Sequence, residues 1–336
     1  MLNELECCKI CPRNCRVNRN DGKKGYCKCD DKIKIALVST HYYEEPCISG
    51  KISVSDYYKD NNCATTSVNN GNNANNVNNS NADNNKIVGG SGTIFFSNCN
   101  LNCIYCQNYE VSQLGKGKEV SIERLAEIMI EQQSRGVNNI NLVTPTMYVY
   151  QIIEAIKIAR KNGLKIPIIY NTNSYENIST IRALNGYIDV YLPDLKYYSD
   201  EIAIKYSKAP NYFKVSTEAI KEMYKQVGEP IFDENGIIKK GVIIRHLILP
   251  NHIQNTEHIL KWIKDTFDNK IYVSVMAQYF PTYKAKNDDK LNRKISTREY
   301  KKVENYMYLL GTENGYMQDL GKHEEEFVPV FDLKNV

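Results

Sequence analysis

Residues 97–108, Ser-Asn-Cys-Asn-Leu-Asn-Cys-Ile-Tyr-Cys-Gln-Asn, decide the fold class of this chain. Three cysteines in this stretch, Cys99, Cys103 and Cys106, are spaced as C-x3-C-x2-C, and Tyr105 stands immediately before the last of them. A strand-like apolar run leads into the stretch, so the cysteines are expected on the loop that follows a strand. Three thiolates on one loop can bind three irons of a cubane [4Fe–4S] cluster and leave the fourth iron open for chemistry. The spacing therefore predicts an iron–sulfur site of the catalytic kind.

Cysteines at this spacing, with an aromatic residue before the last one, resemble the signature of the radical S-adenosylmethionine (SAM) superfamily. The flanking sequence resembles one uncharacterised branch related to pyruvate formate-lyase activating enzyme. The segments that carry this second resemblance are 8–19, 91–96, 141–146, 191–196, 244–250 and 278–281. The resemblance implies a [4Fe–4S] cluster and SAM as cofactors. It also implies reductive cleavage of SAM to a 5′-deoxyadenosyl radical, which abstracts a hydrogen atom from the substrate.

Residues 89–320 alternate between strand and helix patterns. The apolar runs predict strands near 93–97, 139–143, 166–171, 187–191, 241–249 and 271–276. Helices are expected at 121–135, 147–161, 175–184, 199–206, 211–227 and 255–267, followed by 296–310 and by a closing strand or cap at 315–319. Such alternation is typical of an α/β fold with a parallel sheet. Together with the resemblance, it indicates a partial (β/α)6 TIM-like barrel of the radical SAM type, with residues 321–336 as a tail.

Residues 1–50 form an N-terminal cysteine-rich module, and 32–39 within it reads as a strand. Its candidate metal ligands are Cys8, Cys11, Cys15 and Cys27. Four thiolates suit a closed site, either a structural zinc or a second iron–sulfur cluster. Disulfides or unliganded thiols are the alternative, and Cys7 or Cys29 can replace one of the four as a ligand. Cys47 is expected to be a buried small residue.

Residues 60–86 differ from the rest of the chain because they are rich in asparagine and nearly free of apolar side chains. Such a segment cannot bury enough surface to offset its ordering entropy. It is therefore predicted to be a disordered insert between Gly50 and Gly89, and a long loop adds little closure entropy to the fold.

Polar residues near the later strand ends are the predicted SAM contacts. They are Thr144, Thr146, Asn171, Asn173, Asp194, Lys196 and Arg245. Asp194 and Lys196 flank one residue, so on an extended strand end their side chains point the same way. The resemblance implies that Lys196 pairs with the SAM carboxylate, whereas the alternative is a plain surface ion pair. Arg245 lies in an apolar strand and must be paired or face a cavity, while the adjacent His246 is expected to be structural.

Composition limits which classes of protein, partners and locations are expected. The chain has 336 residues, 42% of them hydrophobic, and 11 cysteines, which favours a large core and metal or redox chemistry over disulfides. A net charge of +4 gives no indication of nucleic acid or membrane as a partner. The sequence shows neither a membrane-spanning run nor a signal-like start, so a cytoplasmic location is expected.

The substrate is left open by the sequence. One hypothesis is an activating enzyme that installs a glycyl radical on a partner protein, and another is radical modification of a different peptide or a small molecule. A non-catalytic iron–sulfur electron-transfer protein is the alternative from another class. For the enzyme, an electron donor such as flavodoxin or ferredoxin is expected.

Overall fold

The computed structural model of the chain describes residues 2–50, 89–320 and 329–336. The predicted insert at 60–86 lies outside the described residues, and so do residues 321–328 of the predicted tail. The description below therefore concerns the cysteine-rich module, the alternating region and a short C-terminal segment.

One large sheet forms the centre of the molecule. Its strands are β1 (Ile33–His41), β2 (Ser91–Phe96), β3 (Lys118–Val120), β4 (Ile140–Val143), β5 (Ile168–Thr172), β6 (Val190–Pro193), β7 (Ile231–Phe232), β8 (Ile238–Leu247), β9 (Tyr272–Met276) and β10 (Gly315–Met317). The order across the sheet is β10-β9-β8-β6-β5-β4-β2-β1-β3, and β7 pairs with β8. From β2 to β10 every neighbouring pair on this path is parallel, which confirms the predicted α/β fold with a parallel sheet.

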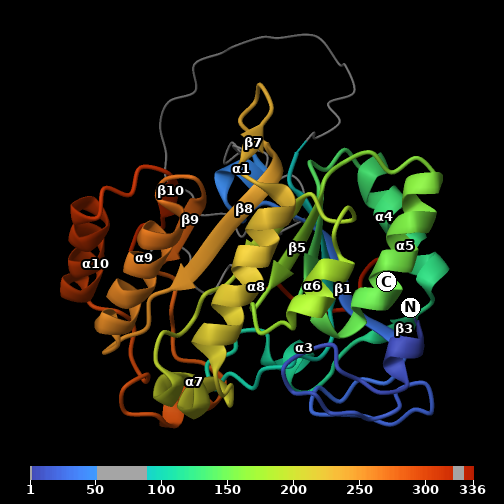
Figure 1. Cartoon of the computed structure of the whole chain (residues 1–336), viewed down its shortest axis with the longest axis horizontal. Coiled ribbons are helices and arrows are strands. Elements are labelled where there is room, and N and C mark those ends of the chain that lie inside the picture. The colour runs from blue at the N-terminus through green and yellow to red at the C-terminus, as the bar shows by residue number, and fades with distance from the viewer. Residues whose placement is uncertain (1, 51–88, 321–328) are drawn as a thin grey trace, which may run out of the picture.

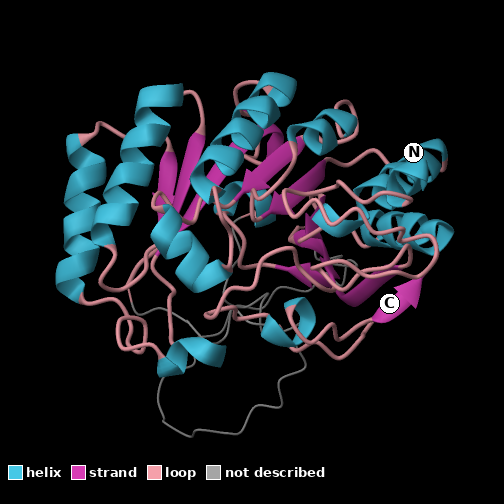
Figure 2. Ribbon diagram, turned by 60° about the horizontal axis from the view of Figure 1, so that its bottom comes forward, coloured by secondary structure: helices cyan, strands magenta, loops and turns pink. Residues whose placement is uncertain are grey.

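Helices lie on the outer face of the curved sheet (Figures 1 and 2). They are α1 (Pro46–Ser49), α3 (Tyr109–Ser112), α4 (Ile122–Ser134), α5 (Val149–Lys161), α6 (Ile178–Ala183), α7 (Asp200–Ser207), α8 (Tyr212–Val227), α9 (Ile253–Phe267) and α10 (Thr297–Leu309). Seven of them correspond to predicted helices, and each of the longer ones turns an apolar stripe toward the sheet. The sequence pattern gave no sign of α1 and α3, because helices of one turn are too short to show a period.

The direction of strand β1 was not predicted from the sequence. Strand β1 pairs antiparallel with β2, so that His41 lies opposite Ser91, the first residue of β2. The chain therefore leaves β1 at the end of the barrel where the parallel strands begin. There α1 packs Cys47 and Ile48 against side chains from β5, β6 and β8. Cys47 is buried, as expected, and α1 closes this end of the barrel like a floor.

The last described segment, residues 329–336, returns to strands β1 and β2. Phe331 packs edge-to-face on Phe95 of β2, with 5.4 Å between the ring centroids. The amide of Val38 donates to the carbonyl of Lys334, and the Asn335 side chain donates to the carbonyl of Val38. The C-terminal segment therefore covers one face of β1 and β2.

The cysteine-rich module lies against the same end of the sheet as the loops that follow the parallel strands (blue in Figure 1). A buried arginine, Arg19, ties the module together and to the barrel. Its guanidinium donates to the carbonyl of Asp30 at 2.8 Å and to the carbonyl of Met147, next to α5, at 2.7 Å. A charged side chain that is fully buried needs such partners, so the contacts fix the module in place.

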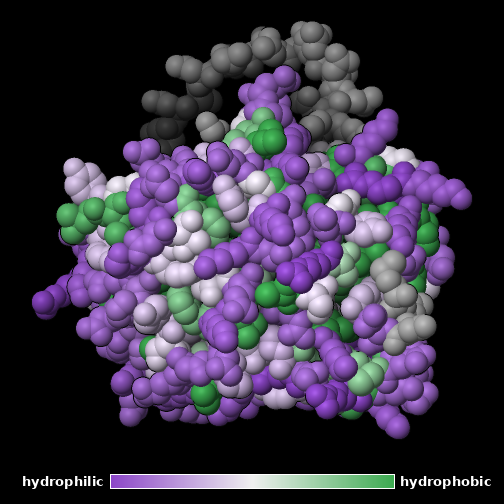
Figure 3. Space-filling model, in the orientation of Figure 1, coloured by the Kyte–Doolittle hydropathy of each residue, from purple (hydrophilic) through white to green (hydrophobic). Residues whose placement is uncertain are grey.

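On the face seen in Figure 3, hydrophilic residues cover most of the surface and hydrophobic residues occur in small separate groups. This face therefore shows no broad apolar patch of the kind that marks a docking surface. Among the described residues, no helix has the length and apolar character that a membrane crossing requires.

Candidate active site

The three motif cysteines occupy the loop between β2 and α3, at the C-terminal end of the first parallel strand. Cys103 is buried, and Cys99 and Cys106 are half-buried. Each sulfur has a polar neighbour: the Ser207 hydroxyl donates to Cys103 at 2.9 Å, Asn173 Nδ2 donates to Cys99 at 3.4 Å, and the Ser112 hydroxyl lies 3.1 Å from Cys106. The loop thus presents three thiols whose surroundings are formed by β5, α3 and α7.

Electrostatics at these thiols favour a bound cationic group. Burial raises the pKa of Cys99, Cys103 and Cys106, that of Cys106 to about 11, and the charge of Cys103 opposes ionisation of the other two. Three thiolates therefore persist here only with a metal to neutralise them. In the part of the chain that the structure describes, no three His, Cys, Asp or Glu side chains converge on one ion. This spread fits a [4Fe–4S] cluster, because its cysteines bind different irons.

A cavity of about 640 Å³ opens beside the cysteine loop and runs down the inside of the barrel. Cys103 and Cys106 line its mouth. Its walls come from the inner faces of β2, β4, β5, β8, β9 and β10, and its far end is formed by the residues that lead from β1 into α1. The volume of this cavity lies within the usual range for ligand and cofactor sites in proteins.

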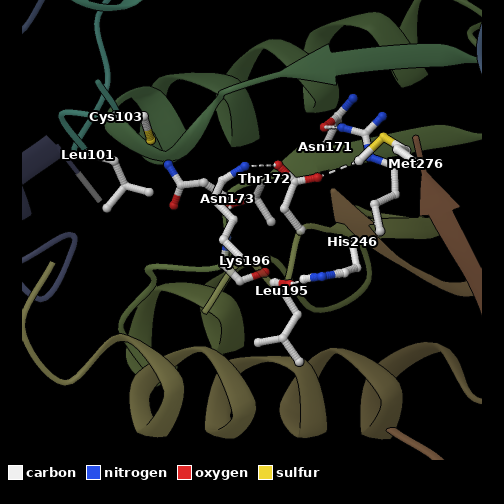
Figure 4. A network of polar contacts seen from close by, with 12 residues as sticks. Leu101, Cys103, Asn171, Thr172, Asn173, Leu195, Lys196, His246 and Met276 are labelled. Carbon is white, nitrogen blue, oxygen red and sulfur yellow. Dashed lines mark hydrogen bonds and ion pairs between the residues drawn. The ribbon is translucent and has the colours of Figure 1, made fainter. Parts of the chain in front are cut away.

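Four of the predicted SAM contacts line this cavity: Asn171, Asp194, Lys196 and Arg245. Lys196 Nζ lies 2.6 Å from Asp194 Oδ2, and the two side chains are only 18% and 16% exposed. The alternative of a plain surface ion pair is therefore wrong. Arg245 Nε binds the other oxygen of Asp194 at 3.1 Å, and Arg245 Nη2 donates to Asn171 at 2.7 Å. Figure 4 shows this network, with Cys103 on its left and Met276 of β9 on its right.

The ion pairs set the charge states of these groups. Lys196 and Arg245 hold the pKa of the buried Asp194 below its usual value, although burial alone would raise it. The Asp194 carboxylate in turn raises the pKa of Lys196 and of Arg245. The wall of the cavity next to the cysteines therefore carries a fixed ammonium, and Lys196 also lowers the pKa of Cys103.

The other three predicted contacts lie differently. Asn173 donates to Cys99 and, at 2.8 Å, to Asn100 Oδ1, so it touches the cysteine loop itself. The hydroxyl of Thr146 donates to Glu176 at 2.7 Å, which turns it away from the cavity described above. Thr144 follows β4 with a positive φ of 57°, and its amide donates to the carbonyl of Asn171. Contact of any of the seven with SAM stays a prediction.

His246 is structural, as the alternation of the strand predicted. It is 1% exposed, and its Nδ1 lies 2.7 Å from the carbonyl oxygen of Leu195, while Nε2 lies 2.9 Å from Thr256 Oγ1. Burial lowers its pKa to about 4, so the ring is neutral at physiological pH. It connects the loop after β6 to α9 and takes no part in the cavity (Figure 4).

Three carboxylates near the site were missed by sequence reasoning. Glu44 and Glu45, between β1 and α1, line the far end of the cavity. Glu44 Oε2 lies 3.2 Å from Arg245 Nη1, and Asn141 donates to Glu44 Oε1 at 3.0 Å. An arginine inside an apolar strand requires a buried anion, and this requirement could have predicted an acidic partner for Arg245.

The third is Glu176, which follows β5. Its Oε1 accepts hydrogen bonds from the hydroxyls of Thr146, Tyr170 and Thr172, and its Oε2 has no partner. Burial raises the pKa of this carboxyl to about 7. The three hydroxyls come from the ends of β4 and β5, so Glu176 fixes the loops that carry Thr144 and Asn173.

The N-terminal cysteines differ in their surroundings. Cys27 and Cys29 share a side-chain hydrogen bond, and Cys11 lies within electrostatic range of Cys27. Asn98 donates to Cys29 at 3.4 Å, which places this group directly behind the motif loop. Cys8 packs with apolar side chains beside α5, and Cys15 accepts from the amide of Tyr26.

Comparison with known proteins agrees with this description. Residues 93–229 match the family model described as the radical SAM superfamily. Two uncharacterised proteins of Methanocaldococcus jannaschii are similar in sequence. The first is 33% identical over 65% of this chain and 62% of its own length, and the second is 22% identical over 82% and 71%. The chain thus spans less than two thirds of the first relative.

Two solved structures illustrate the similarity of fold. Streptococcus suis SuiB bound to the precursor peptide SuiA has a TM-score of 0.46 and 19% identity, over 68% of this chain and 47% of that one. A radical SAM methyltransferase from Sphaerobacter thermophilus has a TM-score of 0.48 and 13% identity, over 67% and 65%.

The strand-end cysteine loop, the parallel sheet and the family match agree on one class. The chain carries a radical SAM domain over residues 93–229, and the superfamily predicted from the cysteine motif is confirmed. Within the superfamily, the sequence relatives found are themselves uncharacterised.

Proposed function

We propose that this chain is a radical SAM enzyme that acts on a substrate held inside the barrel. The observation that carries the proposal is the position of Cys103 and Cys106 at the mouth of a cavity of about 640 Å³, beside the fixed ammonium of Lys196. A [4Fe–4S] cluster bound there would supply one electron to cleave SAM and produce a carbon radical that abstracts hydrogen.

Different residues of the chain would have different roles in such a reaction. Cys99, Cys103 and Cys106 would bind three irons of the cluster. Lys196 would pair with the carboxylate of SAM, since Asp194 holds it charged and aimed into the cavity. The walls below the cysteines would shield a reactive carbon radical from part of the solvent and so limit side reactions.

The substrate class is a finer proposal. A peptide or protein substrate is compatible with the resemblance to activating enzymes, and activation of a glycyl radical enzyme is one such case. We also propose that Cys8, Cys11, Cys15 and Cys27 bind a second metal, either zinc or another iron–sulfur cluster, with Cys29 as a substitute ligand. A flavodoxin or ferredoxin would serve as electron donor.

The test is anaerobic reconstitution followed by iron counting and an assay for 5′-deoxyadenosine with SAM and dithionite. About four irons and formation of 5′-deoxyadenosine are expected, and about eight irons would indicate a second cluster at the N-terminal cysteines. Alanine at Cys99, Cys103 or Cys106 should abolish SAM cleavage. Cys47→Ala, which removes a buried thiol from the floor, is the matched control and should retain it. Cleavage that survives loss of a motif cysteine would refute the assignment of that ligand.

A further inference from the structure

The far end of the cavity contains a carboxyl group, Glu45, that makes no ion pair with a described cation of the chain, and burial raises its pKa. Glu45 is 8% exposed and lines the cavity, and its Oε2 has no hydrogen-bond partner among the described residues. A buried carboxylate oxygen without a partner costs free energy, so its retention on the wall of a cavity points to a partner that arrives from outside the chain.

The cations of the cavity are already engaged by other groups. Arg245 directs its three nitrogens to Glu44, Asp194 and Asn171. Lys196 binds Asp194 at the opposite end, near the cysteines. Three carboxylates thus face two cations among the described residues that line the cavity. Although Arg245 attracts Glu45 electrostatically, it makes no hydrogen bond to it.

The remaining neighbours of Glu45 add no positive charge. His41 lines the same end of the cavity, and burial together with the charge of Arg245 lowers its pKa to about 4, so its ring is neutral. Ser274 bonds Glu45 as a neutral hydroxyl, and Tyr316 is within electrostatic range. Carboxylate oxygens beside aromatic rings form a favourable environment for an ammonium group.

Between this end and the cysteines, apolar side chains line much of the wall. They include Phe95, Val143, Leu247 and Met276. An occupant that spans the cavity therefore meets Glu45 at the floor, a middle where these apolar side chains lie beside the Asp194–Arg245 ion pair, and the cysteine loop at the mouth. A slender aliphatic chain with a positive charge at its inner end matches this sequence of environments.

We propose that the substrate carries a protonated amine on an aliphatic stem, of the kind found in a lysine side chain, and that Glu45 binds this ammonium at the floor of the barrel. The inference rests on the proposed function for the existence of a substrate in this cavity. It assigns to Glu45 a role in substrate recognition, and it places the C–H bonds of the stem between the floor and the cysteine loop.

The experiment measures binding and does not depend on SAM cleavage. The full-length, anaerobically reconstituted protein is titrated with n-pentylammonium, 1-pentanol and pentanoate, and dissociation constants are obtained by ligand-detected NMR. The ammonium is expected to bind at least about 10-fold more tightly than the alcohol, and pentanoate more weakly than either. Equal affinity for the three compounds, or no binding of the ammonium up to about 10 mM, would overturn the proposal.

Variants then locate the effect. Glu45→Gln should abolish the preference for the ammonium over the alcohol, whereas Glu119→Gln, on the exposed strand β3, should keep it. A preference that persists in Glu45→Gln overturns the assignment to Glu45. The comparison of the three probes on the unmodified protein stands even if Glu45→Gln does not fold. Loss of SAM cleavage with the ammonium preference intact would refute only the proposed function.

Discussion

The hydroxyl of Ser207 donates a hydrogen bond to the sulfur of Cys103 at 2.9 Å. Ser207 is the last residue of α7, and its oxygen is also paired with the hydroxyl of Tyr197, which pairs with Tyr105 in the motif itself. The aromatic residue before the last motif cysteine therefore belongs to a chain of hydroxyls that ends on the sulfur of Cys103. Hydrogen bonds to cluster sulfurs stabilise the reduced, more negative state.

Removing that hydrogen bond should lower the reduction potential. In Ser207→Ala, loss of a hydrogen bond to a charged sulfur, worth about 1.5 kcal/mol, corresponds to a decrease of about 60 mV in a one-electron midpoint potential. Spectroelectrochemical titration of the reconstituted protein measures this value. Ser134→Ala, on the exposed side of α4, is the control and should show no shift. An unchanged potential in Ser207→Ala would mean that this hydroxyl does not reach the cluster.

Lys196 is expected to contribute to SAM affinity and not to cluster assembly. Lys196→Met should weaken SAM binding by about 30-fold, because it removes the ammonium that would pair with the SAM carboxylate, an interaction worth about 2 kcal/mol. The iron content should stay unchanged. Equilibrium dialysis with SAM and iron analysis measure the two quantities. Lys261→Met removes the exposed pair with Asp265 and should alter neither. Loss of iron in Lys196→Met would instead show a structural role.

Arg245 is expected to contribute strongly to the stability of the fold. Arg245→Met leaves Glu44 and Asp194 buried without their cation, which typically costs about 3–5 kcal/mol of unfolding free energy. The control Arg182→Met removes a guanidinium that is 65% exposed and paired with Glu222, and should cost less than about 1 kcal/mol. Anaerobic urea denaturation followed by circular dichroism compares the variants. Similar unfolding midpoints would contradict the central place of Arg245 in the network.

Glu176 should make the free energy of unfolding fall as the pH rises from about 4.5 to about 7. Its folded pKa of about 7 lies above the ordinary value for a glutamic acid, so the folded state holds a proton that the unfolded state releases. The stabilisation is complete below the unfolded pKa and is lost as the pH rises toward the folded one, by about 3 kcal/mol in total. Unfolding free energies at pH 5 and pH 8 measure this dependence. In Glu176→Gln the decrease should be smaller by that amount, and an equal decrease in both proteins would exclude Glu176 as its source.

Much of the fold followed from the sequence because the parallel strands are short apolar runs and most helices carry an apolar stripe. The cysteine loop was predicted at the end of the strand that became β2, and Lys196 was predicted to point the same way as Asp194. Both predictions depend only on local spacing, which the fold preserves.

What the sequence did not reveal depends on contacts between distant segments. The ion pair of Arg245 joins β8 to a residue that precedes it by 201 positions, and no local pattern records such a partner. The same holds for Ser207, which lies 104 positions from Cys103. The hydrogen bond from the Thr146 hydroxyl to Glu176, 30 positions further along the chain, is likewise absent from any local pattern.

Because β1 is antiparallel to β2, the two ends of the cavity are formed by different segments of the chain. The cysteines and Lys196 belong to the barrel proper, whereas Glu44, Glu45 and α1 reach the opposite end of the cavity from a segment that precedes it in the chain. Under the proposed function, changes at Glu45 would alter which molecule is accepted, because Glu45 makes no hydrogen bond to Arg245, whereas Glu44 belongs to the ion-pair network of Arg245 and Asp194. Such an arrangement allows specificity to diverge among relatives through replacement of one residue.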